Sequence, residues 1–199
     1  MDPKTPRTKR RSRAATARAV CGEHITEQRG NHPVLALVET ARRVPAAAEH
    51  AATPIVSRLV FGSIDLAAEL SVAPEDRTAG AHARSALVMA SAAAGLAPPI
   101  DEVTASIDAH RRFGHDIGYG ARLGFGAKLC VHPAQVAVAA SAFAPDADDV
   151  AWAHRVLSAT DASAMAVVDG RMVGKPVIDR ARRVLAAGTQ TPAGLARSA

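Results

Sequence analysis

The chain has 199 residues, of which 48% are hydrophobic, and it carries a formal net charge of +5. Length and hydrophobic content suffice for one globular domain with a sizeable core. Aromatic residues make up only 3% of the sequence, which argues against nucleic-acid binding by base stacking. Two isolated cysteines cannot form a secreted disulfide framework, and no apolar run is long enough to span a membrane. We therefore expect a cytoplasmic protein.

The positive charge is concentrated at the N-terminus. Residues 1–18 contain seven Lys and Arg residues, and Asp2 is the single acid there, so the remainder is close to neutral. Such composition is typical of a solvated segment, and we interpret residues 1–30 as a basic, disordered arm. An organelle transit peptide and a contact site for anionic partners such as nucleic acid are the less favoured alternatives.

From residue 31 onward, short apolar runs alternate with helical stretches. The expected strands are 34–38, 58–62, 97–100 and 127–131, and the expected helices are 41–51, 80–94, 133–142 and 146–159. This alternation predicts an α/β fold with a parallel sheet. The glycine-rich stretch 102–126 indicates a long loop with a short helix near 116–123.

The C-terminal part has a different pattern. Residues 164–177 read as a β-hairpin with Asp169 and Gly170 at its turn, followed by a helix over 178–187 and a frayed tail over 189–199. Four βα units amount to half of an eightfold barrel. We therefore predict the last four units of a TIM-barrel-type fold over 31–144, with a C-terminal helix, hairpin and lid segment over 145–188.

Two acids, Glu39 and Asp65, each follow an apolar run where a buried parallel strand would end. Chemistry gathers at that end of barrel strands, and Mg²⁺ favours a site with one or two carboxylates. Both acids also precede helical stretches, where a carboxylate could instead satisfy free backbone N–H groups. On spacing alone, the capping interpretation is slightly favoured.

Two further strand ends carry polar residues. In GFGAKLCVHPAQV (124–136), alternation along a strand would place Lys128, Cys130 and His132 on one side. His132 could be a ligand, a proton donor or a hydrogen-bonded structural residue. Asp101 ends LAPPID (96–101), whose two prolines fix an extended path against which a substrate could lie.

Five segments occur in an order that resembles a known family: LALVETAR, LVFGSIDLAAEL, ARSALVMASAAAGLAPPID, GFGAKLCVHPAQV and VVDGRMVGKPVIDRARRVL. Together, over residues 32–188, they resemble the C-terminal half of the HpcH/HpaI aldolase and citrate lyase family, in particular its citrate lyase beta subunit-like CoA-ester lyases. The resemblance implies a Mg²⁺-dependent TIM-barrel enzyme that makes or cleaves a carbon–carbon bond in an acyl-CoA, as a trimer or hexamer. A related aldolase branch that acts on 2-keto acids is a minor alternative.

The resemblance also assigns residues. The two metal carboxylates of the family fall on Glu39 and Asp65, which reverses the preference for capping. Arg42, Asp101 and His132 are candidates for binding the substrate or the CoA moiety, and no catalytic residue is assigned. The expected reaction is cleavage of a (hydroxy)acyl-CoA ester in which the metal stabilises an enolate.

The sequence departs from the family at several points. Segments like LDLEDAV and RVN, which bring an acidic loop and a substrate-binding Arg in these enzymes, do not occur in this chain. Arg43 stands where the family has a Gly, and Gly174 stands where related lids carry an acid. The alternative is therefore a catalytically inactive half-barrel remnant that needs a partner chain.

Overall fold

The computed structural model describes residues 33–106, 110–162 and 166–189. The chain divides into two units, one with residues up to Val103 together with Tyr119–Leu129, and one with Thr104–Gly118 together with the residues from Cys130 onward. The arm predicted over 1–30 and the tail beyond residue 189 lie outside the described residues. Within the described ranges, no helix is long and apolar enough to cross a membrane.

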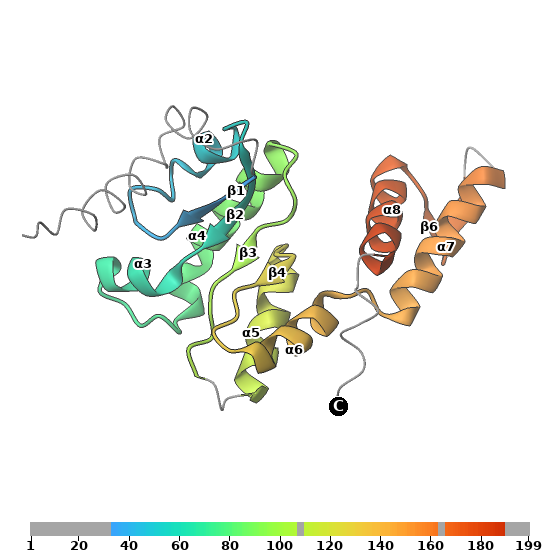
Figure 1. The fold of residues 1–199 in the computed structure, drawn as a ribbon. Coiled ribbons are helices and arrows are strands. Elements are labelled where there is room, and N and C mark those ends of the chain that lie inside the picture. The colour runs from blue at the N-terminus through green and yellow to red at the C-terminus, as the bar shows by residue number, and fades with distance from the viewer. Residues whose placement is uncertain (1–32, 107–109, 163–165, 190–199) are drawn as a thin grey trace, which may run out of the picture. The chain divides into compact units, whose positions relative to one another are not determined.

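The first unit is built on a parallel sheet (Figure 1). Its strands follow one another in the order β1 (Val34–Val38), β2 (Val56–Phe61), β3 (Ile100–Asp101) and β4 (Ala127–Lys128). Each strand pairs in parallel with the next, as in α/β folds with helical crossovers. The prediction of an α/β fold with four parallel strands is confirmed.

The boundaries of three strands differ from those predicted, and β2 spans 56–61 rather than 58–62. β3 lies at 100–101 rather than 97–100, because Pro98 and Pro99 have no N–H to donate to a neighbouring strand. β4 ends at Lys128, so the strand predicted over 127–131 is too long. The idea that Lys128, Cys130 and His132 alternate along one strand is therefore wrong.

Three helices accompany this sheet: α2 (Ala47–Ala51), α3 (Ser63–Leu70) and α4 (Arg77–Ala93). Residues 41–46 form turns instead of the predicted start of a helix, since Pro45 disfavours helical geometry at the residue before it. The Asp76 carboxylate accepts hydrogen bonds from the N–H groups of Thr78 and Ala79, so α4 begins three residues before the predicted position 80. A helical stretch was expected after Asp65, and α3 begins two residues before Asp65, at Ser63.

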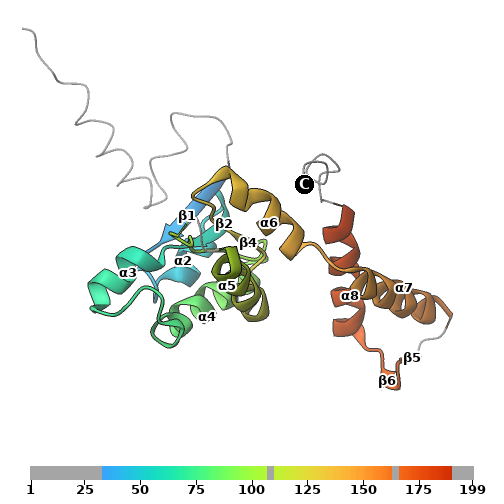
Figure 2. The same ribbon diagram turned by 90° about the horizontal axis from the view of Figure 1, so that it is seen from below.

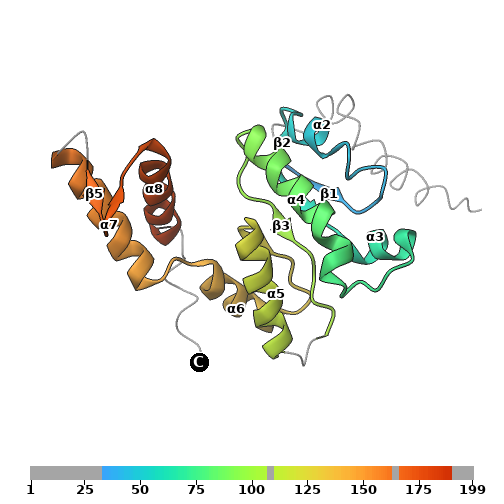
Figure 3. The same cartoon turned by 180° about the vertical axis from the view of Figure 1, so that it is seen from behind.

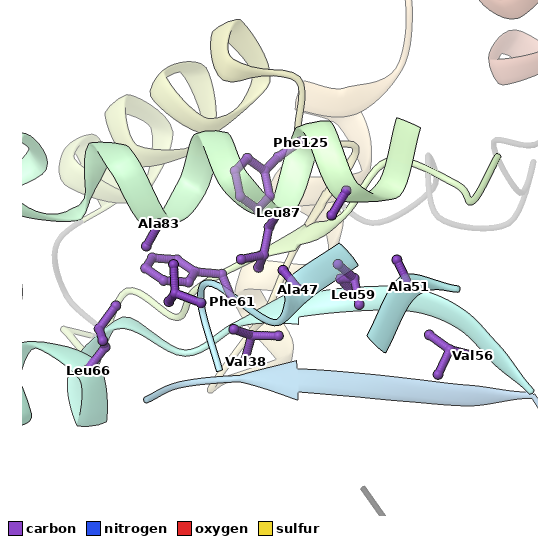
Figure 4. Close-up of a cluster of buried hydrophobic side chains, with 12 residues drawn as sticks. Val38, Ala47, Ala51, Val56, Leu59, Phe61, Leu66, Ala83, Leu87 and Phe125 are labelled. Carbon is purple, nitrogen blue, oxygen red and sulfur yellow. The ribbon is translucent and has the colours of Figure 1, made fainter. Parts of the chain in front are cut away.

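The core of the first unit lies between the sheet and the helices α2 and α4. Figure 3 shows α4 lying over the strands, and Figure 4 shows Val38 and Phe61 pointing toward Leu87 on that helix. Side chains alternate along β1, so Leu35 and Leu37 point to the opposite face, where they are 57% and 40% exposed. Glu39 continues the series of Leu35 and Leu37.

The second unit contains helices and a hairpin. Its elements are α6 (Pro133–Phe143), α7 (Ala147–Ala162), β5 (Val167–Val168), β6 (Arg171–Met172) and α8 (Lys175–Thr189). α7 and α8 lie side by side (Figure 2). Asp169 and Gly170 have φ angles of 49° and 74°, as a two-residue hairpin turn of type I′ requires. The predicted hairpin turn is confirmed.

One further helix, α5 (His110–Leu123), has residues in both units. It is longer than the short helix predicted near 116–123. In the second unit, Phe113 and Ile117 of this helix form a small apolar cluster with Ala139 of α6, and Cys130 packs against that cluster. Cys130 therefore serves as part of the packing.

Candidate functional site

The structure brings the side chains of Glu39 and Asp65 together. Glu39 directly follows β1, and Asp65 lies in the first turn of α3, which begins after β2. Val38 is opposite Phe61 in the parallel register, and the Gly62 N–H donates to the Val38 carbonyl at 3.0 Å. The two strands therefore end side by side, and the two carboxyl groups reach hydrogen-bonding contact.

Gly62 makes this approach possible. A Cβ atom at this position would lie 2.6 Å from the Glu39 Cβ and 3.2 Å from its Oε2. The backbone angles of Gly62, φ −111° and ψ 98°, are open to any residue. Glycine is needed at position 62 because the Glu39 side chain occupies the space that the side chain of a larger residue would fill.

The electrostatics of the pair favour a bound cation. The pKa of Glu39 is raised, chiefly because burial disfavours its charged form and further because the negative charge and hydrogen bond of Asp65 act on it. Arg43 opposes this shift only in part. A divalent cation bound beside Asp65 would stabilise the ionised form of Glu39 and would offset the negative charge that raises its pKa.

Neither acid is a helix cap. The N-cap of α3 is Gly62 and that of α2 is Ala46, and neither cap makes a side-chain hydrogen bond. Instead, Glu69 Oε2 accepts a hydrogen bond from the Ala41 N–H at 2.9 Å, which ties the loop after β1 to α3. Sequence reasoning missed Glu69, although its spacing of four residues from Asp65 places both acids on one helix face.

Asp101 lies elsewhere on the sheet. It is 2% exposed and belongs to the face that packs against α4, where its Oδ1 is 3.2 Å from Arg84 Nε. The Arg84 guanidinium also bonds Glu102 and lies 4.8 Å from the centre of the Phe61 ring. Asp101 therefore belongs to a buried ion pair, and its role in substrate binding stays a prediction.

Sequence reasoning also missed Arg84. It shares the buried stripe of α4 with Leu87 and Ser91, so a charge within an otherwise apolar helical stripe was the available signal. Such a charge requires a buried partner.

The other two candidates occupy exposed positions. His132 is the N-cap of α6, and its Nδ1 accepts from the Ala134 N–H at 3.2 Å. Arg42 lies in the loop between β1 and α2 with an exposed side chain. The structure thus brings together Glu39 and Asp65 among the candidates, with Arg42 in the loop that Glu69 holds.

The donor set suits an ion that completes its coordination with water or substrate. Within residues 33–106, 110–162 and 166–189, no three His, Cys, Asp or Glu side chains gather as a metal-binding group. A closed structural zinc site would need four protein ligands, whereas Mg²⁺ commonly binds one or two carboxylates and keeps several waters. The pair therefore fits Mg²⁺ better than zinc.

Comparison with known proteins assigns the chain to a family. The sequence model of HpcH/HpaI aldolase/citrate lyase matches residues 4–133. The chain belongs to this family. The match includes the strand ends that carry Glu39 and Asp65, and it begins within the segment interpreted as a basic arm.

Curated members of the family are similar in sequence to this chain over most of its length. A citrate lyase subunit beta-like protein of Mycobacterium tuberculosis is 35% identical over 159 residues, which cover 76% of this chain and 58% of that protein. A (3S)-malyl-CoA thioesterase of Cereibacter sphaeroides is 34% identical over 160 residues, which cover 77% of this chain and 56% of that protein. The chain thus spans a little over half the length of the curated relatives that it matches.

A solved structure is also similar to most of this chain. The protein CitE from Mycobacterium tuberculosis, in complex with magnesium, acetoacetate and coenzyme A, matches with a TM-score of 0.68 and 32% identity. The match covers 79% of this chain and 61% of that chain. The four-stranded parallel sheet therefore corresponds to part of the fold of a citrate lyase beta-like protein.

Proposed function

We propose that this chain carries the metal site of a magnesium-dependent carbon–carbon lyase that acts on a (hydroxy)acyl-CoA ester. The observation that carries the proposal is the contact between the Glu39 and Asp65 carboxyl groups at the shared end of two parallel strands. Magnesium and coenzyme A in the CitE complex, and malyl-CoA in the name of the Cereibacter relative, support the substrate class.

Glu39 and Asp65 would hold the ion, which, when bound, supplies electrostatic stabilisation for negative charge that develops on a thioester or carboxylate oxygen. Gly62 leaves room for Glu39 beside β2, and Glu69 fixes the loop that follows β1. In this proposal Arg42, exposed on that loop, binds an anionic group of the substrate or of CoA.

Asp101 and His132 do not enter the proposed mechanism. Asp101 Oδ1 pairs with Arg84, and His132 Nδ1 accepts from the Ala134 N–H at the start of α6. The barrel half expected over 31–144 and the trimer or hexamer remain predictions.

The metal assignment can be tested by titration calorimetry with Mg²⁺ on the wild-type chain and on Glu39→Gln and Asp65→Asn. We expect one site in the wild type and at least about tenfold weaker binding in each variant, since each loses a charged ligand. Glu49→Gln, in α2 and exposed, is the matched control for loss of a carboxylate and should bind as the wild type does. Unchanged binding in both site variants would exclude the assignment.

The reaction can be tested with malyl-CoA as the first substrate, and the products distinguish two reactions. Carbon–carbon cleavage converts the hydroxyl-bearing carbon to the aldehyde of glyoxylate and leaves acetyl-CoA after the other carbon takes up a proton. Hydrolysis instead adds water to the thioester and releases malate and free CoA. Magnesium-dependent acetyl-CoA supports the lyase, whereas free CoA without acetyl-CoA would show a thioesterase.

A second candidate function is a noncatalytic half-barrel that needs a partner chain. It is favoured by the exposure of Leu35 and Leu37 on the sheet face opposite α4, where another layer of side chains would be expected in a barrel. This candidate predicts Mg²⁺ binding that depends on Glu39 and Asp65 without turnover of any acyl-CoA by the purified chain. Turnover by the purified chain would exclude it.

A further inference from the structure

The second unit contains a cavity made of residues that the proposed metal site does not use. It lies between α7, the β5–β6 hairpin and the start of α8, and its volume is about 550 Å³. Pockets for small ligands commonly measure about 300–1,000 Å³. The cavity is therefore large enough for a small organic molecule.

The wall of the cavity combines apolar and polar surface in similar amounts. Val156 is 0% exposed and Val173 is 8% exposed, and Val168 and Val177 add further aliphatic surface. Trp152 contributes an aromatic ring to the same wall. The valine side chains favour the apolar part of a ligand, and the Trp152 ring favours a ligand that is flat.

The lining of the cavity carries an excess of positive charge. Arg171 and Arg180 line it, together with the single acid Asp169. The Asp169 carboxylate already pairs with Arg155 at 3.2 Å, so it does not neutralise the two lining arginines.

Arg171 and Arg180 have N–H groups that are available to a ligand. Arg180 lies 4.6 Å from the centre of the Trp152 ring, and its Nη2 is 3.7 Å from Asp149, beyond hydrogen-bonding distance. Within the described part of the chain, Arg171 makes no ion pair. Each guanidinium offers five N–H donors, so the pair can bind a carboxylate.

We propose that this cavity binds a small aromatic carboxylate. Its carboxylate pairs with Arg171 and Arg180, and its ring lies against Trp152 and the valine side chains. The residues involved all belong to the second unit and none is a metal candidate, so this proposal stands independently of the lyase function.

The test uses the fluorescence of Trp152, which is the only tryptophan of the chain. The probe is para-nitrobenzoate, a flat carboxylate whose nitro group quenches tryptophan emission. We expect saturable quenching with the full-length chain. In Arg171→Ala/Arg180→Ala, we expect the dissociation constant to rise about fivefold or more, because charge-assisted bonds to the carboxylate are lost.

Two controls separate this site from general electrostatic attraction. Arg182→Ala/Arg183→Ala removes the same charge from exposed positions of α8 outside the cavity and should bind the probe as the wild type does. The neutral analogue para-nitrobenzyl alcohol should quench more weakly and should be insensitive to Arg171→Ala/Arg180→Ala.

Several outcomes would overturn the proposal. These are the absence of saturable quenching at millimolar probe, equal affinities in the two double variants, or equal binding of the alcohol and the carboxylate. A chain that self-associates in sedimentation experiments and binds no probe at any protein concentration would show that a second copy covers the cavity instead.

Discussion

The substitution Gly62→Ala tests whether the Glu39 side chain lies against the backbone of Gly62, the residue that follows β2. The added methyl carbon would lie 2.6 Å from the Glu39 Cβ, whereas non-bonded carbon atoms prefer separations of about 3.5–4.0 Å. The Glu39 Cβ is bonded to the backbone directly after β1 and cannot rotate away. Relief of the clash therefore requires the strand ends to separate by about 1 Å.

The magnitude follows from two opposing effects. Overpacking of this kind costs about 1–3 kcal/mol of the free energy of unfolding. At φ −111° alanine is unstrained, so its lower entropy in the unfolded chain returns about 0.4–1 kcal/mol. We expect a net loss of about 1–2 kcal/mol. We also expect Mg²⁺ affinity to fall about tenfold, because a ligand of the metal is displaced.

Urea unfolding and Mg²⁺ calorimetry on the same samples measure both effects. Gly114→Ala is the matched control, because a Cβ at this exposed position of α5 meets nothing within 4 Å, and it should leave Mg²⁺ affinity unchanged. A Gly62→Ala chain with wild-type stability and wild-type Mg²⁺ affinity would refute the placement of Glu39. Lower stability with unchanged Mg²⁺ affinity would refute the metal site but would still support the packing of Glu39 against Gly62.

Three further predictions follow from the ionisation and packing of single residues. Without metal, the free energy of unfolding should fall as pH rises from 4.5 through the raised pKa of Glu39, because the folded chain holds the carboxyl proton of Glu39 more tightly than the unfolded chain. Urea unfolding at a series of pH values should show this slope in the wild type and not in Glu39→Gln. Arg84→Leu should cost about 3–5 kcal/mol in the same assay, since it leaves Asp101 buried without its partner, and Arg84→Leu/Asp101→Asn should cost less. Gly170→Ala should lower stability by about 1 kcal/mol in thermal unfolding followed by circular dichroism, because the φ of 74° is unfavourable for alanine.

The sequence predicted those parts of the fold that depend on local pattern. β1 was predicted with its observed bounds, and the Asp169–Gly170 turn was predicted from turn residues that accept positive φ. Errors arose where proline or pairing decides the ends of elements. α2 begins only after Pro45, and β3 begins only after Pro98 and Pro99. The apolar pattern alone continues through all three prolines and therefore predicts earlier starts.

The candidate site was predicted only in part for a related reason. Spacing placed Glu39 and Asp65 at strand ends but could not distinguish capping from metal binding, which depends on the direction of the side chains. Asp101 also follows a strand pattern, yet alternation puts its side chain on the opposite face of the sheet, against Arg84. A shift of one residue in the pairing register moves every side chain of a strand to the other face, and no local pattern in the sequence determined the register of β3.

The metal pair depends on the pairing of β1 with β2, and this makes a last prediction. Glu39 meets Asp65 only while Val38 stays opposite Phe61, so an ion held by both carboxylates binds the paired strands and not the separated ones. Ligand at about 100 times its dissociation constant should stabilise that state by about 2.7 kcal/mol. Hydrogen exchange of the Gly62 amide, which bonds the Val38 carbonyl at 3.0 Å, should slow by up to about a hundredfold when saturating Mg²⁺ is added. The slowing should vanish in Glu39→Gln; if it persists there, the ion binds elsewhere and the strand ends are held together without it.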